Sequence, residues 1–454
     1  MPRSLFAKIW DRHIVARNPG GADIIAIDRV FLHERTGAAA LRRMAEQGRS
    51  VRDPARVFAV MDHIVDTRPG RGDGTLMPGG EGFITQTREA ALAAGINLID
   101  VNDRDQGIVH VISPELGVVL PGLTLVAPDS HTCTQGAFGA LAWGIGSSEA
   151  EHAMVTGTLR LSRPKTMRVT FTGALAAGVT AKDMALALIA RHGSGGGTGH
   201  AVEFAGDAVS ALDVEGRQTL CNMATEFSAM TALIAPDEQT FAYLSGRGHA
   251  PASFEEPYWS TLHTDHGALF DEELTFAAAE VEPMVSWGTS PSQAVPVTGV
   301  VPHGPARAHE YIGLAAGQPI AGVPLDAAFI GSCTNARITD LRRAARLLRG
   351  RRIAPSIRKA LVVPGSSQVR RQAEAEGLHT VFEAAGFEWR MSGCSLCFYA
   401  GGEGFAQGSR TISSTNRNFE GRQGLGVRTH IASPETVAAS AVAGVIADPR
   451  ELAR

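Results

Sequence analysis

The sequence predicts an α/β fold built from more than one domain. Short apolar runs alternate with helical patterns along the chain, and polar residues gather directly after several of the apolar runs. Ligand groups in α/β sheets lie in the loops beyond the carboxyl ends of the strands, and the polar clusters fit that arrangement. At 454 residues the chain is too long for one hydrophobic core, so we expect two to four domains.

Five apolar runs have the length and composition of strands. They cover residues 95–101, 122–128, 166–172, 326–331 and 359–364. Helical spacing of apolar residues predicts helices over Glu89–Ala94, Ser148–Arg160, Ala181–Arg191 and Asp340–Leu348. The glycine-rich segment 192–200 lacks the Gly-Lys-Ser/Thr ending of a phosphate-binding loop, so we interpret it as a turn that enters the next strand.

Two changes in composition suggest domain boundaries. Ser162-Arg163-Pro164-Lys165 precedes a new strand signal, and residues 285–296 are rich in proline and serine, as linkers are. We therefore expect three domains, covering residues 1–164, 165–290 and 291–454.

The overall composition excludes several classes of protein. Apolar residues make up 44% and charged residues 19%, as in ordinary globular proteins, and the net charge of −4 offers no attraction for nucleic acid or an anionic membrane. No apolar run reaches eighteen residues, so we expect no transmembrane helix. Five cysteines, an odd number, argue against a secreted disulfide framework. Since the N-terminus resembles neither a signal nor a transit peptide, we expect a cytoplasmic protein.

Three cysteines carry the strongest functional signal. Cys333 lies in Phe-Ile-Gly-Ser-Cys-Thr-Asn, and Cys394 and Cys397 form a Cys-x-x-Cys pair in a second polar loop. Three such thiols can hold three corners of a [4Fe-4S] cluster and leave its fourth iron open to substrate as a Lewis acid. Zinc ribbons usually need two Cys-x-x-Cys pairs, and a thioredoxin-like pair needs a βαβ context. A structural zinc site and two buried thiols without function remain alternatives.

Other polar clusters could carry acid–base chemistry. Asp62-His63 and Asp129-Ser130-His131 pair a carboxylate with an imidazole, and the second cluster directly follows an apolar run. Asn222 and Glu226 lie four residues apart, which would place them on one face of a helix. A capped turn and a solvated helix surface are the plainer interpretations of these patterns.

An arginine-bearing loop suits an acidic substrate. The segment 414–424 contains Arg417 and Arg422 among asparagines and glycines. Guanidinium groups bind carboxylates through two parallel hydrogen bonds, so two of them in one loop fit a dicarboxylic acid.

Together these segments resemble the aconitase superfamily, and within it most closely the large subunits of 3-isopropylmalate dehydratases. The resemblance covers nearly the whole chain. Its motifs are Met-Asp-His-Ile-Val, Pro-Asp-Ser-His-Thr, Cys-Asn-Met-Ala-Thr-Glu, Gly-Ser-Cys-Thr-Asn, Gly-Cys-Ser-Leu-Cys and Asn-Arg-Asn-Phe-Glu-Gly-Arg-Gln-Gly, in this order. The fold implied is three α/β/α domains of the aconitase type around a central cleft.

The resemblance also implies roles for individual residues. The ligands of one [4Fe-4S] cluster would be Cys333, Cys394 and Cys397. The catalytic cleft would be lined by Asp62, His63, His110, Asp129, Ser130, His131, Asn222 and Glu226. Substrate would be bound by Asn335, Asn416, Arg417 and Arg422. The implied reaction is dehydration and rehydration of a hydroxy dicarboxylate, with His131 and Asp129 as candidate proton donor to the departing hydroxyl.

The catalytic base is expected from another chain. Single-chain relatives carry it in a C-terminal swivelling domain, and this sequence ends about thirty residues after the arginine loop. We therefore expect a separate small subunit that carries the swivel domain.

Departures from the family pattern concern the substrate. Pro128, Cys133 and Gln135 interrupt the usual Gly-Asp-Ser-His-Thr segment and the Thr-His-Gly that follows, and residues 398–403 differ after the Cys-x-x-Cys pair. The leading hypothesis is isomerisation of 2- and 3-isopropylmalate in leucine biosynthesis. The same chemistry on the pair citraconate and 2-methylmalate, or on 2,3-dimethylmalate, is the alternative. An RNA-binding protein without a cluster and a zinc protein are remoter ones.

Overall fold

A computed structural model describes residues 1–17, 20–254, 257–398 and 402–452. The chain forms two compact units. Unit 1 comprises Met1–Asp62, Glu81–Ala174 and Gly197–Ala277, and unit 2 comprises His63–Gly80, Leu175–Gly196 and Ala278–Arg454. The predicted boundaries at residues 164 and 290 stay a prediction.

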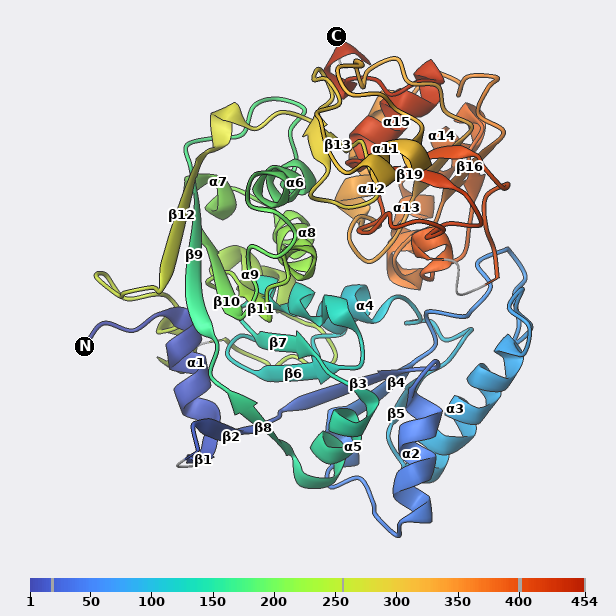
Figure 1. The fold of residues 1–454 in the computed structure, drawn as a ribbon. Coiled ribbons are helices and arrows are strands. Elements are labelled where there is room, and N and C mark those ends of the chain that lie inside the picture. The colour runs from blue at the N-terminus through green and yellow to red at the C-terminus, as the bar shows by residue number, and fades with distance from the viewer. Residues whose placement is uncertain (18–19, 255–256, 399–401, 453–454) are drawn as a thin grey trace. The chain divides into compact units, whose positions relative to one another are not determined.

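The central sheet of unit 1 is parallel and has the strand order β5-β4-β3-β6-β7 (Figure 1). Its strands are β3 (Arg29–His33), β4 (Val57–Val60), β5 (Asn97–Ile99), β6 (Thr124–Ala127) and β7 (Leu141–Gly144). β4 and β6 are buried on both faces, as expected for a parallel sheet covered by helices. Because β4, β3 and β6 are neighbours, the loops after them leave the same edge of the sheet.

Helices α2 (Gly37–Glu46), α3 (Gly80–Ala94) and α5 (Ser147–Thr156) pack on this sheet. Leu41, Ala91 and Ala153 from these helices belong to one apolar cluster with residues of β3, β4 and β6. The prediction of a helix up to Arg160 is wrong at its end. Gly157 adopts a left-handed φ of 71° that ends α5, and the chain continues as strand β8.

Two further sheets complete unit 1. An antiparallel sheet has the order β1-β2-β8, with β1 (Ile14–Arg17), β2 (Ala22–Ala26) and β8 (Thr158–Ser162). A parallel sheet has the order β11-β10-β9-β12, with β9 (Lys165–Thr172), β10 (His200–Ala205), β11 (Thr231–Leu233) and β12 (Glu272–Ala277). The remaining helices are α1 (Leu5–His13), α4 (Val109–Glu115), α7 (Asp207–Ser210), α8 (Val214–Met223), α9 (Glu238–Leu244) and α10 (Pro257–Ser260).

Unit 2 is built on a parallel sheet of order β17-β16-β15-β18-β19. Its strands are β15 (Ala327–Ile330), β16 (Lys359–Val362), β17 (Glu388–Trp389), β18 (Arg410–Ser413) and β19 (Arg428–Ile431). Its helices are α6 (Ala181–His192), α11 (Ala306–Ile312), α12 (Ile338–Leu348), α13 (Ser367–Ala375), α14 (Leu378–Ala385), α15 (Pro434–Ala443) and α16 (Pro449–Leu452).

Helix α12 shows why such segments fold as they do. Ile338, Leu341, Ala345 and Leu348 are spaced three or four residues apart and are all buried, while Arg342 on the opposite face is exposed. The helix therefore has one apolar face to cover the core of unit 2.

The predicted linker at residues 285–296 is instead part of a β-hairpin. Strands β13 (Met284–Ser286) and β14 (Ala294–Pro296) pair antiparallel, and Val285 and Trp287 are buried. The apolar residues between the prolines and serines decide this outcome, since they pack instead of being solvated.

The α/β class is confirmed, and the five predicted strands correspond to β5, β6, β9, β15 and β16. Within the described ranges, no helix combines the length and the apolar character that crossing a bilayer requires.

Candidate active site

The first group of candidate residues lies at the carboxyl edge of the central sheet in unit 1. Asp129 follows β6 directly and caps the 3₁₀ segment η2 (Ser130–Phe138), where its Oδ1 accepts a hydrogen bond of 2.7 Å from the His131 amide. Gly136 lets this segment pack closely, because a Cβ there would lie 1.7 Å from the carbonyl oxygen of Ala232.

Two histidines, His110 and His131, form a cluster with the carboxylates of Asp129 and Glu226. His110 Nε2, from α4, lies 2.9 Å from Asp129 Oδ1, although the contact lacks hydrogen-bond geometry. His131 Nδ1 lies 3.6 Å from the same oxygen, and His131 Nε2 is hydrogen-bonded to Glu226 Oε1 at 2.9 Å. The two imidazoles and the Glu226 carboxylate are buried. The His131 ring therefore lies between two carboxylates, an arrangement that stabilises a protonated imidazole and orients it.

Asn222 and Glu226 do not share one continuous α-helix face, so that prediction is wrong. Helix α8 ends at Met223 and the chain tightens into the 3₁₀ turn η3 (Ala224–Phe227), which carries Glu226. Asn222 Nδ2 donates a 2.8 Å hydrogen bond to Thr134 Oγ1 of η2. Both residues still reach the same segment, Asn222 through Thr134 and Glu226 through His131.

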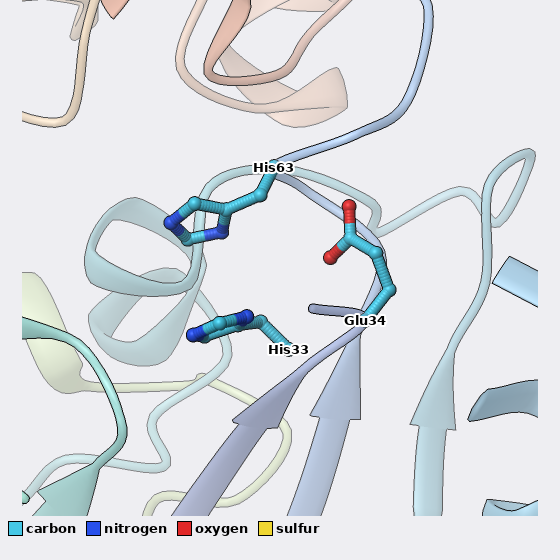
Figure 2. Close-up of side chains that lie close together, drawn as sticks. All are labelled: His33, Glu34 and His63. Carbon is cyan, nitrogen blue, oxygen red and sulfur yellow. The ribbon is translucent and has the colours of Figure 1, made fainter. Parts of the chain in front are cut away.

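Asp62 organises the neighbouring loops. Its Oδ2 accepts a 3.0 Å hydrogen bond from the amide of Val109 at the start of α4, one residue before His110. Its own amide donates to Glu34 Oε2 at 3.2 Å. Figure 2 shows Glu34 with His33 at the end of β3, and His63 in the segment that follows β4. Ser130 is exposed, and its Oγ lies 3.4 Å from His131 Nδ1.

His33 and Glu34 were not among the site residues predicted from the sequence. Both are buried: His33 is the last residue of β3, Glu34 follows it, and Nε2 of His33 lies 2.9 Å from the carbonyl oxygen of Pro128. The signal was present, since a His-Glu pair directly after an apolar run resembles the Asp-His pairs that were identified.

The three candidate cysteines all belong to unit 2. Cys333 follows β15, and Cys394 and Cys397 lie in a tight turn with a 2.9 Å hydrogen bond from the amide of Cys397 to the carbonyl of Cys394. All three are buried, and each is free of a disulfide. Ser332 Oγ lies 3.1 Å from Cys397 Sγ, so the two cysteine loops touch.

Both cysteine loops contain strained backbone. Ser332 has a φ of 80° and Ser395 a φ of 45°, and among the described residues only Ser228 is another non-glycine with positive φ. Such conformations persist where the surroundings impose them, and they concentrate at functional sites.

Polar donors surround the sulfur atoms. Asn416 Nδ2 donates to Cys333 Sγ at 3.4 Å, and its Oδ1 lies 3.7 Å from Cys397 Sγ. Arg422 Nη2 lies 3.7 Å from Cys397 Sγ, and Thr415 Oγ1 lies 3.6 Å from it. Amide, hydroxyl and guanidinium donors aimed at buried thiols suit a ligand set that carries negative charge on sulfur.

Asn335 and Arg417 are the other residues of unit 2 that were predicted to bind substrate. Asn335 Nδ2 donates to Asp340 Oδ1 at 3.0 Å, at the start of α12. The ring of Phe398 lies 5.8 Å from the His63 ring and 4.9 Å from the Arg422 guanidinium, so it lies next to both. Arg417 is partly exposed. Of the divergent segment 398–403, residues 399–401 lie outside the described part of the chain.

Two further buried cations were missed. Arg337 donates to the carbonyl oxygens of Cys333 and Thr334 at 2.7 Å each. Lys182 donates to the carbonyl oxygens of Ser414 and Thr415 at 2.7 Å each. No short motif marks either residue, because their partners are set by the tertiary fold.

Two residues that depart from the family pattern, Cys133 and Gln135, lie in η2 after β6. The Cys133 thiol donates to the carbonyl of Cys221 at 3.2 Å, in the packing of η2 against α8. Gln135 is fully buried, and neither of its amide atoms has a hydrogen-bond partner among the described residues.

Comparisons with known proteins agree with the resemblance. The 3-isopropylmalate dehydratase large subunit 1 of Bradyrhizobium diazoefficiens is 49% identical over 467 aligned positions, which cover 100% of this chain and 97% of that protein. Among solved structures, histidinol dehydrogenase from Elizabethkingia anophelis matches 60% of this chain and 61% of its own, at 11% identity. Its TM-score of 0.16 is too low to indicate a shared fold. The model of the aconitase family (aconitate hydratase) matches residues 7–444, so the chain belongs to the aconitase family.

Proposed function

We propose that this chain is the large, catalytic subunit of a [4Fe-4S] hydro-lyase that interconverts 2-isopropylmalate and 3-isopropylmalate in leucine biosynthesis. The observation that carries the proposal is the 49% identity, over the whole chain, to a 3-isopropylmalate dehydratase large subunit. The buried His131–Glu226 and Asp129 contacts and the buried cysteines support it independently.

Cys333, Cys394 and Cys397 would hold the cluster. Their thiols are buried, free of disulfides and contacted by amide and guanidinium donors, so this set fits a thiolate-bound cluster. When bound, such a cluster supplies a Lewis acid at the iron that has no protein thiolate. Burial of all three cysteines also keeps bulk water away from the sulfur atoms.

His131 would hold the proton that the departing hydroxyl needs. Glu226 at 2.9 Å and Asp129 at 3.6 Å provide the negative charge that a protonated ring requires in a buried setting. Asp62 would position His110 through the start of α4, and Ser130 and Asn222 would orient groups around the same segment. His63, whose ring lies next to that of Phe398, would be a second imidazole in the cleft that can carry a proton.

Arg417 and Arg422 would bind the substrate carboxylates, with Asn335 and Asn416 beside the cluster. Two guanidinium groups match the two carboxylates of an alkylmalate. Cation and amide donors that already contact sulfur in this part of unit 2 are consistent with that role.

The architecture and assembly that we propose follow the resemblance. Three α/β/α domains, covering residues 1–164, 165–290 and 291–454, would surround a central cleft, and each range contains a parallel sheet. A small subunit with the swivel domain would supply the catalytic base, in keeping with the name "large subunit" of the relative. We place the complex in the cytoplasm, without nucleic-acid or membrane partners.

The test combines the chain, reconstituted anaerobically with iron and sulfide, with its small subunit. We expect dehydration of 2-isopropylmalate by the pair and none by the chain alone. Turnover by the chain alone would contradict the two-subunit proposal, and a pair that carries a cluster and ignores isopropylmalate would contradict the substrate.

A second candidate is the same reaction on 2-methylmalate or 2,3-dimethylmalate. Gln135 favours it, because this fully buried position departs from the family pattern four residues after His131, and neither of its amide atoms has a hydrogen-bond partner among the described residues. Assaying the pair against the three alkylmalates in parallel distinguishes the candidates by the ratio of their kcat/KM values.

A further inference from the structure

Lys182 is a fully buried lysine in the first turn of α6, in unit 2. Its ammonium donates hydrogen bonds of 2.7 Å to the carbonyl oxygens of Ser414 and Thr415. Within the described part of the chain, no carboxylate forms an ion pair with it. A charge this deeply buried is costly unless negative charge lies nearby.

The two carbonyls that Lys182 binds directly precede the sulfur-binding asparagine. Asn416 contacts Cys333 Sγ at 3.4 Å and Cys397 Sγ at 3.7 Å, and the Thr415 hydroxyl lies 3.6 Å from Cys397 Sγ. Fixing two successive peptide groups therefore fixes the direction in which the next side chain points. Lys182 thus orders the polar contacts to two of the three cysteines without touching either.

Two of the cysteines are among the groups whose negative charge stabilises the protonated form of Lys182. Burial lowers the pKa of Lys182 to about 7, and Asp340, Cys333 and Cys397 oppose that shift, in this order. Burial raises the pKa of the Asp340 carboxyl, so its negative charge is itself disfavoured. Thiolates bound to iron keep their charge, and they would be a lasting source of the negative charge that this buried cation needs.

We propose that Lys182 is a positioning residue for the iron–sulfur cluster: its ammonium orders the Ser414–Thr415 backbone and binds a positive charge to the segment whose Thr415 and Asn416 side chains contact the sulfur atoms. The inference rests on the proposed cluster at the three cysteines. Lys182 lies outside the cysteine and arginine loops and is separated from Ser414 by 232 positions in the sequence.

The test compares Lys182→Gln, which keeps a hydrogen-bond donor and removes the charge, with Lys182→Arg, which keeps the charge. Lys359→Gln is the matched control, since Lys359 also belongs to unit 2 but lies at the amino end of β16 and pairs with Glu403 at 2.8 Å. For each reconstituted protein, iron and sulfide content, the midpoint potential of the cluster and hydrogen exchange of the 414–416 amides are measured.

We expect a lower midpoint potential in Lys182→Gln, because a lost positive charge disfavours the added electron. Lys182→Arg and Lys359→Gln should keep the wild-type potential. The 414–416 amides should exchange about tenfold faster in Lys182→Gln and at the wild-type rate in Lys359→Gln.

An unchanged potential in Lys182→Gln at normal cluster content would overturn the proposal, as would an equal drop in Lys182→Arg. If Lys182→Gln does not fold, Lys182→Arg decides: a retained potential supports the role of the charge, and a lowered one refutes it. Wild-type protein that takes up no iron and sulfide would instead refute the cluster itself, and with it the inference.

Discussion

Replacing Glu226 by glutamine should slow the reaction while it leaves the fold intact. His131 Nε2 lies 2.9 Å from Glu226 Oε1, and the two side chains are only 7% and 8% exposed. Glutamine keeps the size and a hydrogen bond but removes the negative charge that favours a protonated ring. The change isolates the electrostatic contribution of this carboxylate to proton transfer.

The expected effect follows from the burial of the pair. A hydrogen bond to a charged group contributes about 1.5–3 kcal/mol, against about 0.5–1.5 kcal/mol for a neutral one. The lost difference of about 1–1.5 kcal/mol corresponds to a fall in kcat of roughly 5- to 13-fold. Greater exclusion of water during turnover would enlarge the effect.

The assay is the initial rate of dehydration per cluster, with the small subunit in excess. Glu203→Gln is the control, because Glu203 is also buried in unit 1 but bonds Thr264, at 2.7 Å, instead of an imidazole. A Glu226→Gln enzyme within twofold of the wild-type rate, at equal cluster content, would refute the proposed role of the pair.

Three further outcomes are expected. Gly136→Ala should destabilise the protein by more than about 2 kcal/mol, because its Cβ would meet the Ala232 carbonyl, whereas Gly82→Ala should be neutral or stabilising; urea midpoints measure both. Burial lowers the pKa of His430 to about 3, so the unfolded state binds more protons between about pH 6.5 and 3. The contribution of His430 to the unfolding free energy should thus be constant above pH 6.5 and fall by up to about 1.4 kcal/mol per unit below it, and the difference between wild type and His430→Gln measures this contribution. Arg422→Lys should raise KM for the dicarboxylate by about tenfold with a smaller change in kcat, since lysine cannot form the paired hydrogen bonds; an unchanged KM would exclude Arg422 from substrate binding.

The sequence predicted the parts of the fold that short-range patterns determine. The apolar run before Asp129 is strand β6, and the polar residues after it begin a capped turn, because Asp129 itself supplies the cap. The helix at Ser148 was predicted too long, since the effect of Gly157 depends on a left-handed conformation that pattern alone does not show. The hairpin at β13 was missed because its residues are ordered by packing within unit 2, which the local sequence pattern does not show.

The candidate site was predictable where chemistry-bearing residues stand together in the sequence. Asp129 and His131 are near neighbours in the sequence, whereas the contact of His131 with Glu226 joins positions 95 residues apart, and the family resemblance implied only that all three line one cleft. Lys182 could not be identified this way. Its hydrogen-bond acceptors are backbone carbonyls of another segment. Every residue type has such a carbonyl, so the sequence does not show which ones bind the lysine.

The most direct test of the account is iron and sulfide analysis of the anaerobically reconstituted chain and its cysteine variants. About four irons and four sulfides per chain are expected in the wild type. They should be lost in Cys333→Ser, Cys394→Ser and Cys397→Ser and retained in Cys133→Ser, whose thiol bonds a backbone carbonyl in the core of unit 1. Zinc without sulfide, or iron that is indifferent to these three substitutions, would contradict the proposed cluster and the reaction that depends on it.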